Sequence, residues 1–145
     1  MVKTVEGFKI GSLLNYSNYL IGGSYVVSPI HANDIDVLLH EYEHTDTIKH
    51  KLWAQNFRTL QQGDEKYDEI DHKRLIEVYE GYIDGVKLNI IVVGATFWPA
   101  YEGAVRSMQA RPDLYMTREA RIELHRSLAR QVAAIAQVGL DEGSY

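Results

Sequence analysis

The sequence predicts a single α/β domain (α+β in some schemes) of 145 residues, with helices packed on a small mixed sheet of four or five strands. Two β-rich runs, LIEVYEGYI and VKLNIIVV, flank Asp84-Gly85 and predict a hairpin. Two earlier runs, 19–23 and 34–42, have the apolar character of strands. Apolar residues recur at helical spacing over much of the chain after Gly94. A chain of this length can bury the core of one domain, and no linker-like stretch divides it.

The composition narrows the classes of partner. The net charge of −5 argues against an extended basic surface for nucleic acid. The chain has no cysteine, which excludes disulfides and thiolate metal sites. No apolar run approaches the roughly 18 residues that cross a bilayer, and the first ten residues lack the apolar core of a signal peptide. We therefore expect a cytoplasmic protein without a membrane partner.

The segment before residue 34 predicts a short helix, a strand and a connection. Residues 7–15 carry apolar side chains at the spacing of one or two helical turns. Residues 19–23 form a short predicted strand that ends in glycine. In the connection, 25–33, Pro29 suits the first turn of a helix, so we expect a brief helix or a loop that ends at Asn33.

The second strand, 34–42, is predicted to lie at the centre of the sheet. Its alternate apolar residues share one face: Ile35, Val37 and Leu39. Asp34 and Asp36 project from the opposite face, which Leu38 continues as an apolar surface. A strand that is apolar on both faces is typical of a central position.

The middle of the chain predicts a helix followed by an exposed connection. Thr45 or Asp46 can cap a helix over 45–62, and Gly63 ends it. The apolar side chains of this helix recur at roughly helical spacing: Ile48, Leu52, Phe57 and Leu60. Residues 63–73 are strongly acidic, so we expect a solvated connection there.

The hairpin is the clearest local prediction. Asp-Gly favours a type I′ turn, because both central residues of that turn need positive φ. The turn then fixes four cross-strand pairs: Ile83 with Val86, Tyr82 with Lys87, Gly81 with Leu88, and Glu80 with Asn89. Gly81 marks either a bulge, which would shift this register by one, or a close approach of another group to the backbone.

Two helices are predicted after the hairpin. The first lies within 94–115, where Pro99 suits its first turn and Pro112 stops it. The second follows a cap at Thr117 and runs to about Val138. Its inward face is predicted to carry Leu124, Leu128, Val132 and Ile135.

The residues with the clearest chemistry surround the first connection. Gly22 and Gly23 carry no Cβ, so the backbone can bend sharply and approach a ligand closely. Ser24 adds a hydroxyl and a backbone N–H. Asp34 and Asp36 project from one face of a strand, where their charges repel unless a cation lies between them. Their oxygens suit Mg²⁺, which takes one or two carboxylates and leaves its other positions to water and phosphates.

This pattern resembles the nucleotidyltransferase superfamily that includes DNA polymerase β, the minimal nucleotidyltransferases and the CCA-adding enzymes. The family has a Gly-Ser turn after a strand, then Asp-x-Asp or Asp-x-Glu on the next strand, and a third acid on a later one. Gly23-Ser24 matches the turn, and Asp34 and Asp36 match the acid pair. The resemblance implies a palm-like core, Mg²⁺ or Mn²⁺ bound by the two aspartates, and a nucleoside triphosphate such as ATP held by Gly22, Gly23 and Ser24.

The family's third acid has no match here. It normally sits on a strand like VKLNIIVV, about where this chain has Asn89. Asparagine can offer a neutral oxygen to a cation, but it adds no negative charge and cannot act as a base. Glu80, paired with Asn89 in the predicted register, could take the acid's place; alternatively, Glu80 is a solvated or ion-paired strand residue. The implied catalytic set is Asp34 and Asp36, completed by Glu80 or Asn89.

The resemblance implies transfer of a nucleoside monophosphate from a nucleoside triphosphate to a hydroxyl, with release of pyrophosphate. The acceptor stays open between a protein, an RNA end and a small molecule. The alternative is a degenerate module that binds nucleotide or a protein partner without chemistry, which the missing acid favours. A third interpretation is an unrelated α/β domain, in which Ser24 would lie far from both aspartates. His31 lies near the aspartates in sequence, but it is not part of the main hypothesis.

Overall fold

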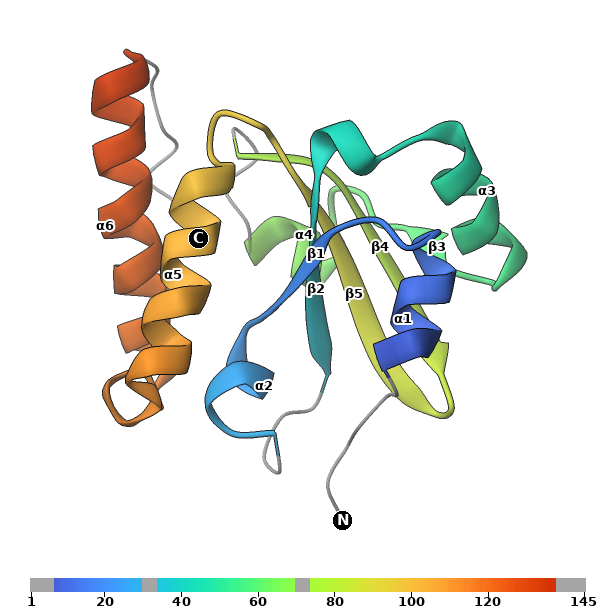
Figure 1. Cartoon of the computed structure of the whole chain (residues 1–145), viewed down its shortest axis with the longest axis horizontal. Helices are drawn as coiled ribbons and strands as arrows, with labels where there is room; N and C mark the ends of the chain where they lie inside the picture. The colour runs from blue at the N-terminus through green and yellow to red at the C-terminus, as the bar shows by residue number, and fades with distance from the viewer. Residues whose placement is uncertain (1–6, 30–33, 70–73, 138–145) are drawn as a thin grey trace.

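A five-stranded mixed sheet forms the centre of the molecule, as the computed structural model shows for residues 7–29, 34–69 and 74–137 (Figure 1). The strands, in the order they occupy in the sheet, are β1 (Tyr19–Gly22), β2 (Ile35–His40), β5 (Val86–Val93), β4 (Leu75–Ile83) and β3 (Arg58–Thr59). β2 and β5 are parallel, and the other neighbours are antiparallel. The prediction of a mixed α/β fold is confirmed.

Helices cover both faces of this sheet. The α-helices are α1 (Gly7–Leu13), α2 (Ser24–Val27), α3 (Asp46–Ala54), α4 (Glu65–Glu69), α5 (Trp98–Ala110) and α6 (Arg118–Ala136). Two 3₁₀ helices, η1 (Glu41–Glu43) and η2 (Pro112–Leu114), follow β2 and α5. In Figure 1, α5 and α6 lie together on one side of the sheet, and α1 and α3 lie on the other. Within these ranges, no helix combines the length and the apolar character that a membrane crossing requires.

Two hydrophobic cores, one on each face, bury β2, which lies between β1 and the central strand β5. Ile35, Val37 and Leu39 belong to the core shared with α1 and α3, whereas Leu38 belongs to the core under α5 and α6. Leu39 and Val37 are fully buried, and Leu38 is 3% exposed. The prediction that β2 is buried on both sides is therefore confirmed, and the aspartate face is the one that α5 and α6 cover.

The hairpin has the predicted turn and register. Asp84 and Gly85 have φ of 53° and 77°, as a type I′ turn requires. Glu80 pairs with Asn89, and the other three predicted pairs are also present. The irregularity of this ladder lies between Leu75 and Glu77 rather than at Gly81. Gly81 instead marks a close approach, because a Cβ there would lie 2.5 Å from the ring of Phe57.

The predicted helix over 45–62 is too long. Thr45 caps α3 as expected, but the helix ends at Ala54 because Asn56 adopts a positive φ of 63°. The N–H groups of Asn56 and Phe57 then bond to the carbonyls of Trp53 and Leu52, which is a Schellman ending with asparagine in the glycine position. Phe57 packs in the same core cluster as Leu52. The residues after Phe57 form β3, which pairs with β4 at the edge of the sheet.

Two connections also differ from expectation. Helix α2 begins at Ser24 and its C-cap is Ser28, so it precedes Pro29 instead of starting there. Residues 30–33, and with them His31 and the predicted end at Asn33, lie outside the described residues. The acidic stretch after Gly63 is not simply a solvated connection, because it contains α4.

The last two helices begin where the sequence indicates. Pro99 lies in the first turn of α5, and the Thr117 hydroxyl accepts a hydrogen bond from the backbone N–H of Ala120 at the start of α6. The inward face of α6 differs from the prediction. Its buried residues are His125, Ala129 and Ala133, while Leu124, Leu128 and Val132 are only partly buried beside them. Ile135 is 85% exposed and lies outside the buried row of His125, Ala129 and Ala133.

Candidate functional site

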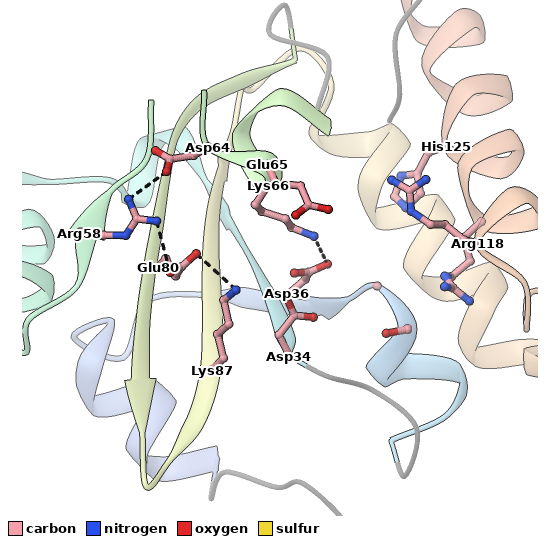
Figure 2. A pocket seen from close by; sticks show the side chains of 13 residues that line it. Asp34, Asp36, Arg58, Asp64, Glu65, Lys66, Glu80, Lys87, Arg118 and His125 are labelled. Atoms are coloured by element: carbon pink, nitrogen blue, oxygen red, sulfur yellow. Dashed lines mark hydrogen bonds and ion pairs between the residues drawn. The ribbon is translucent and has the colours of Figure 1, made fainter. Parts of the chain in front are cut away.

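A pocket of about 530 Å³ opens on the aspartate face of the sheet. Gly23 and Ser24 line it from the β1–α2 turn, and Asp34 and Asp36 line it from the start of β2. Side chains of β3, β4, β5, α4 and α6 complete the wall (Figure 2). The pocket lies within the 300–1,000 Å³ range typical of small-molecule sites. Of the residues that the sequence assigned to phosphate and metal, Gly23, Ser24, Asp34 and Asp36 therefore share one cavity, whereas Gly22 does not line it.

The glycine turn and the acid pair are in direct contact. Gly22 is the cross-strand partner of Asp36, and Gly23 follows with a positive φ of 69°. A Cβ at position 23 would lie 2.5 Å from Oδ2 of Asp36. Glycine is therefore required here for two reasons: the backbone conformation and the space that the carboxylate occupies. The turn and Asp36 therefore lie next to each other rather than far apart.

Asn89 links the two aspartates. Its Nδ2 donates to Oδ2 of Asp34 at 2.7 Å and to Oδ1 of Asp36 at 3.2 Å. Asn89 is fully buried and Asp36 is 5% exposed, whereas Asp34 is half-buried. The Oδ1 atom of Asn89 is buried without a hydrogen-bond partner. The amide thus lies beside both aspartates, as expected for the third position, but it faces them as a donor.

Lys66 provides the charge that neutralises Asp36. Its Nζ lies 2.9 Å from Oδ2 of Asp36, and the two side chains are only 13% and 7% exposed. Lys66 comes from α4, which Figure 2 shows above the aspartates with the lysine reaching down to them. Sequence reasoning missed this residue, because it treated the whole acidic stretch as a solvated connection.

Glu80 faces the pocket from β4, on the same sheet face as Asn89. Its two carboxylate oxygens lie 3.5 Å from a guanidinium nitrogen of Arg58 and 3.5 Å from Nζ of Lys87. Arg58 also donates to Asp64 at 3.0 Å. The backbone N–H of Gln61 and the Arg58 guanidinium lower the pKa of Asp64, so this acid stays ionised. Glu80 is therefore ion-paired, the alternative that the sequence left open.

The wall opposite these strands comes from α6. Arg118 and Arg121 lie one turn apart, and Arg121 is held by hydrogen bonds to the carbonyls of Tyr115 and Met116. His125 follows one turn later and is 6% exposed. Burial lowers its pKa to about 3, and the positive charge of Arg74 adds to this shift. The histidine is neutral at pH 7, so the arginines carry the positive charge of this wall.

A divalent cation fits the acid pair in part. Within the described ranges, no group of three or more histidine or acidic side chains is arranged to hold a metal ion. The aspartates nevertheless converge on a single polar group, the Asn89 amide. The buried, unsatisfied Oδ1 of Asn89 is the kind of atom that an ion or a water satisfies. As the amide is oriented, its Nδ2 faces the aspartates and Oδ1 points away from them, so the arrangement presents two carboxylates to one hard cation that would keep water or phosphate as its other ligands.

Comparison of the chain with protein-family models, with curated proteins and with solved structures gives no match.

Proposed function

We propose that the pocket binds a nucleoside triphosphate with Mg²⁺ or Mn²⁺ and transfers its nucleoside monophosphate to a hydroxyl. The observation that carries this proposal is the contact between Gly23 and Asp36. It joins a Gly-Ser turn, suited to phosphate, to a pair of adjacent carboxylates, suited to a hard cation, in one polar pocket. The resemblance of the Gly-Ser and Asp-x-Asp pattern to nucleotidyltransferases agrees with this chemistry.

Asp34 and Asp36 would hold the cation, and Asn89 would add a neutral third ligand once its amide turned its oxygen towards them. When bound, the cation would neutralise negative charge that develops on the transferring phosphoryl group. The described residues offer fewer anionic ligands here than the two-cation arrangement of many phosphoryl transferases, which clamps both reacting oxygens. Glu80 is a poor substitute for the missing acid, because its two oxygens already face the side chains of Arg58 and Lys87. We therefore expect one cation, carried in with the nucleotide.

The remaining groups of the pocket would bind and orient the substrate. Gly23 leaves room for the Asp36 carboxylate beside the turn, and Ser24 offers its hydroxyl to a phosphate oxygen. Arg118 and Arg121 supply positive charge from the opposite wall. In the transfer, the acceptor oxygen bonds to the α-phosphorus as the bond to the pyrophosphate oxygen breaks. Asp34, the less buried aspartate, would receive the acceptor's proton.

The direct test is transfer of label from each α-³²P nucleoside triphosphate, with Mg²⁺ or Mn²⁺, to the components of a cell extract. The intact protein should label a fraction that the Asp34→Asn/Asp36→Asn double variant leaves unlabelled. An Asp46→Asn/Asp113→Asn variant makes the same charge change at exposed sites and should label as the intact protein does. Label transferred by both the intact protein and the pocket variant, or by neither, would contradict the transferase proposal. The labelled fraction would identify the acceptor as a protein, an RNA end or a small molecule. We expect the protein to act in the cytoplasm.

A binding module without chemistry is the second candidate. The contacts of the acid pair favour this candidate: Lys66 already offsets the charge of Asp36, and the Asn89 amide donates to both carboxylates, without any metal. This candidate predicts that a nucleoside triphosphate binds and is released unchanged. Equilibrium binding of labelled ATP, followed by recovery of intact ATP after incubation of the complex with the cell extract, would distinguish it from the transferase.

A further inference from the structure

The acid pair contains its own counter-ion. Nζ of Lys66 lies 2.9 Å from Oδ2 of Asp36, on the carboxylate that also accepts from Asn89 through Oδ1. Both side chains of the ion pair are nearly buried, so solvent screens their attraction weakly. In Figure 2 the ammonium lies between the aspartates and the α4 helix that carries it. A positive group is therefore present next to the ligands where a divalent cation would bind.

We propose that Lys66 couples cation binding to nucleotide binding: it weakens the site for a bare divalent cation and turns to the phosphates when a metal–nucleotide complex enters. The inference rests on the proposed function for its second half, the transfer to phosphate. Its first half, competition with the bare cation, needs only the ion pair with Asp36.

The competition follows from the charges. A divalent cation on Asp36 lies close to the ammonium, and two positive charges held together in a poorly solvated pocket repel strongly. Displacing the lysine instead breaks a nearly buried ion pair. Either route lowers the affinity of the aspartates for a cation that arrives without an anion.

The nucleotide removes this conflict. A triphosphate brings several negative charges into the pocket that Lys66 lines together with Gly23 and Ser24. The flexible four-carbon stem of lysine lets its ammonium move from a carboxylate to a phosphate while α4 stays in place. The cation and the ammonium then each have an anionic partner. By linkage, the metal must strengthen nucleotide binding by the same factor as the nucleotide strengthens metal binding.

The test measures two affinities of one variant, Lys66→Met. Binding of Mn²⁺ alone is followed by electron paramagnetic resonance, and binding of α,β-methylene-ATP is followed by calorimetry at saturating Mn²⁺. We expect Mn²⁺ alone to bind Lys66→Met about tenfold more tightly than the intact protein, and the nucleotide analogue to bind about tenfold more weakly. The opposite signs are diagnostic, because a merely structural role for Lys66 would weaken both affinities. Lys66→Arg should restore part of the nucleotide affinity.

Lys49→Met is the matched control, since it removes one lysine charge from a surface pair with Asp46 and should change neither affinity. Lys66→Gln replaces Lys66→Met if the latter does not fold. The proposal would be overturned if Lys66→Met, or Lys66→Gln in its place, bound Mn²⁺ alone with unchanged or weaker affinity. If Mn²⁺ binds the variant more tightly but no protein binds the analogue, the proposed function fails and the competition stands. If the analogue binds the variant as well as the intact protein, the coupling fails and the proposed function stands.

Discussion

Gly23 and Asp36 are in contact across the first two strands: a Cβ at position 23 would lie 2.5 Å from Oδ2 of the aspartate. The backbone of residue 23 also has a positive φ of 69°, which side chains other than glycine rarely adopt. The pairing of Gly22 with Asp36 in the β1–β2 ladder holds the turn beside this aspartate. The shape of the pocket thus depends on residue 23 having no Cβ.

Gly23→Ala should destabilise the protein and disturb Asp36. The positive φ alone costs about 1–2 kcal/mol, and displacing the buried carboxylate adds about 1–3 kcal/mol. Urea unfolding measures the total. Gly85→Ala is the control, because its φ is 77° and nothing lies within 4 Å of the added Cβ. Equal losses in the two variants would mean that Asp36 is not held against the turn.

Asn89→Asp should make folding depend on divalent cations. The change removes the amide donor and buries a third carboxylate beside Asp34 and Asp36, which should cost at least about 3 kcal/mol without a cation. Saturating Mn²⁺ should recover much of this loss, about 2.7 kcal/mol at a hundred times the dissociation constant. Thermal unfolding with and without Mn²⁺ measures the recovery. Asn89→Leu also loses the donor but gains no ligand, so Mn²⁺ should not rescue it.

Glu80→Gln should leave cation binding unchanged. Both oxygens of Glu80 face Arg58 and Lys87, and Arg58 is more than half exposed, so only a small loss of stability is expected. Mn²⁺ titration in the presence of α,β-methylene-ATP provides the measurement, with Asp36→Asn as the variant that should lose binding. A loss in Glu80→Gln as large as that in Asp36→Asn would make Glu80 the missing acidic ligand.

His125 should make the protein lose stability in mild acid. Its pKa falls from 6.5 to about 3 on folding, because burial disfavours the charged ring and Arg74, Lys66 and Arg121 repel it more than Asp36 attracts it. A lowered histidine pKa means that the unfolded chain binds the proton first. The stabilisation is complete above pH 6.5 and is lost as the pH falls towards 3. Between pH 7 and 5 this amounts to about 2 kcal/mol.

His125→Asn isolates the contribution of this histidine. Its unfolding free energy should fall by about 2 kcal/mol less than that of the intact protein over the same pH range. His50→Asn removes an exposed histidine and should retain the slope of the intact protein. A slope in His125→Asn equal to that of the intact protein would mean that the ring of His125 is accessible to protons in the folded state.

Gly81→Ala tests how closely Phe57, which precedes β3, packs against β4. A Cβ at position 81 would lie 2.5–2.6 Å from three ring atoms of Phe57, so the ring must shift within the core. Overpacking of this kind costs about 1–3 kcal/mol. Gly94→Ala should change stability by less than about 0.5 kcal/mol, because its nearest neighbour lies at 3.5 Å. Chemical unfolding of both variants gives the difference, and a neutral Gly81→Ala would contradict the close approach.

The parts of the fold that could be predicted from the sequence are those fixed by neighbouring residues. Asp84-Gly85 determines a turn, and the turn determines the register that pairs Glu80 with Asn89. Thr117 and Pro99 mark the starts of the last two helices in the same local way. In the candidate site, the Gly-Ser turn and the aspartates could be found because their contact follows from two adjacent strands.

The remaining parts depend on contacts between distant segments. Arg58 and Thr59 are a strand only because β4 is beside them, and Phe57 and Leu60 also fit helical spacing. A signal for the true end of α3 was present in Asn56, because asparagine tolerates positive φ. Lys66 had no such signal, since its partner Asp36 lies 30 residues earlier in the chain. The charges of a pocket are set by tertiary structure, which periodicity does not report.

The pocket wall begins at Gly23 and ends at His125. During synthesis the sheet strands and both aspartates therefore leave the ribosome well before the arginines of α6. The sheet can pair and bury much of its core while one side of the cavity is still missing. Because Ala129 and Ala133 are small, α6 docks through a narrow seam against α5, and this docking completes the pocket. The acid pair is enclosed only when α6 is in place, because Arg118, Arg121 and His125 line one side of the cavity.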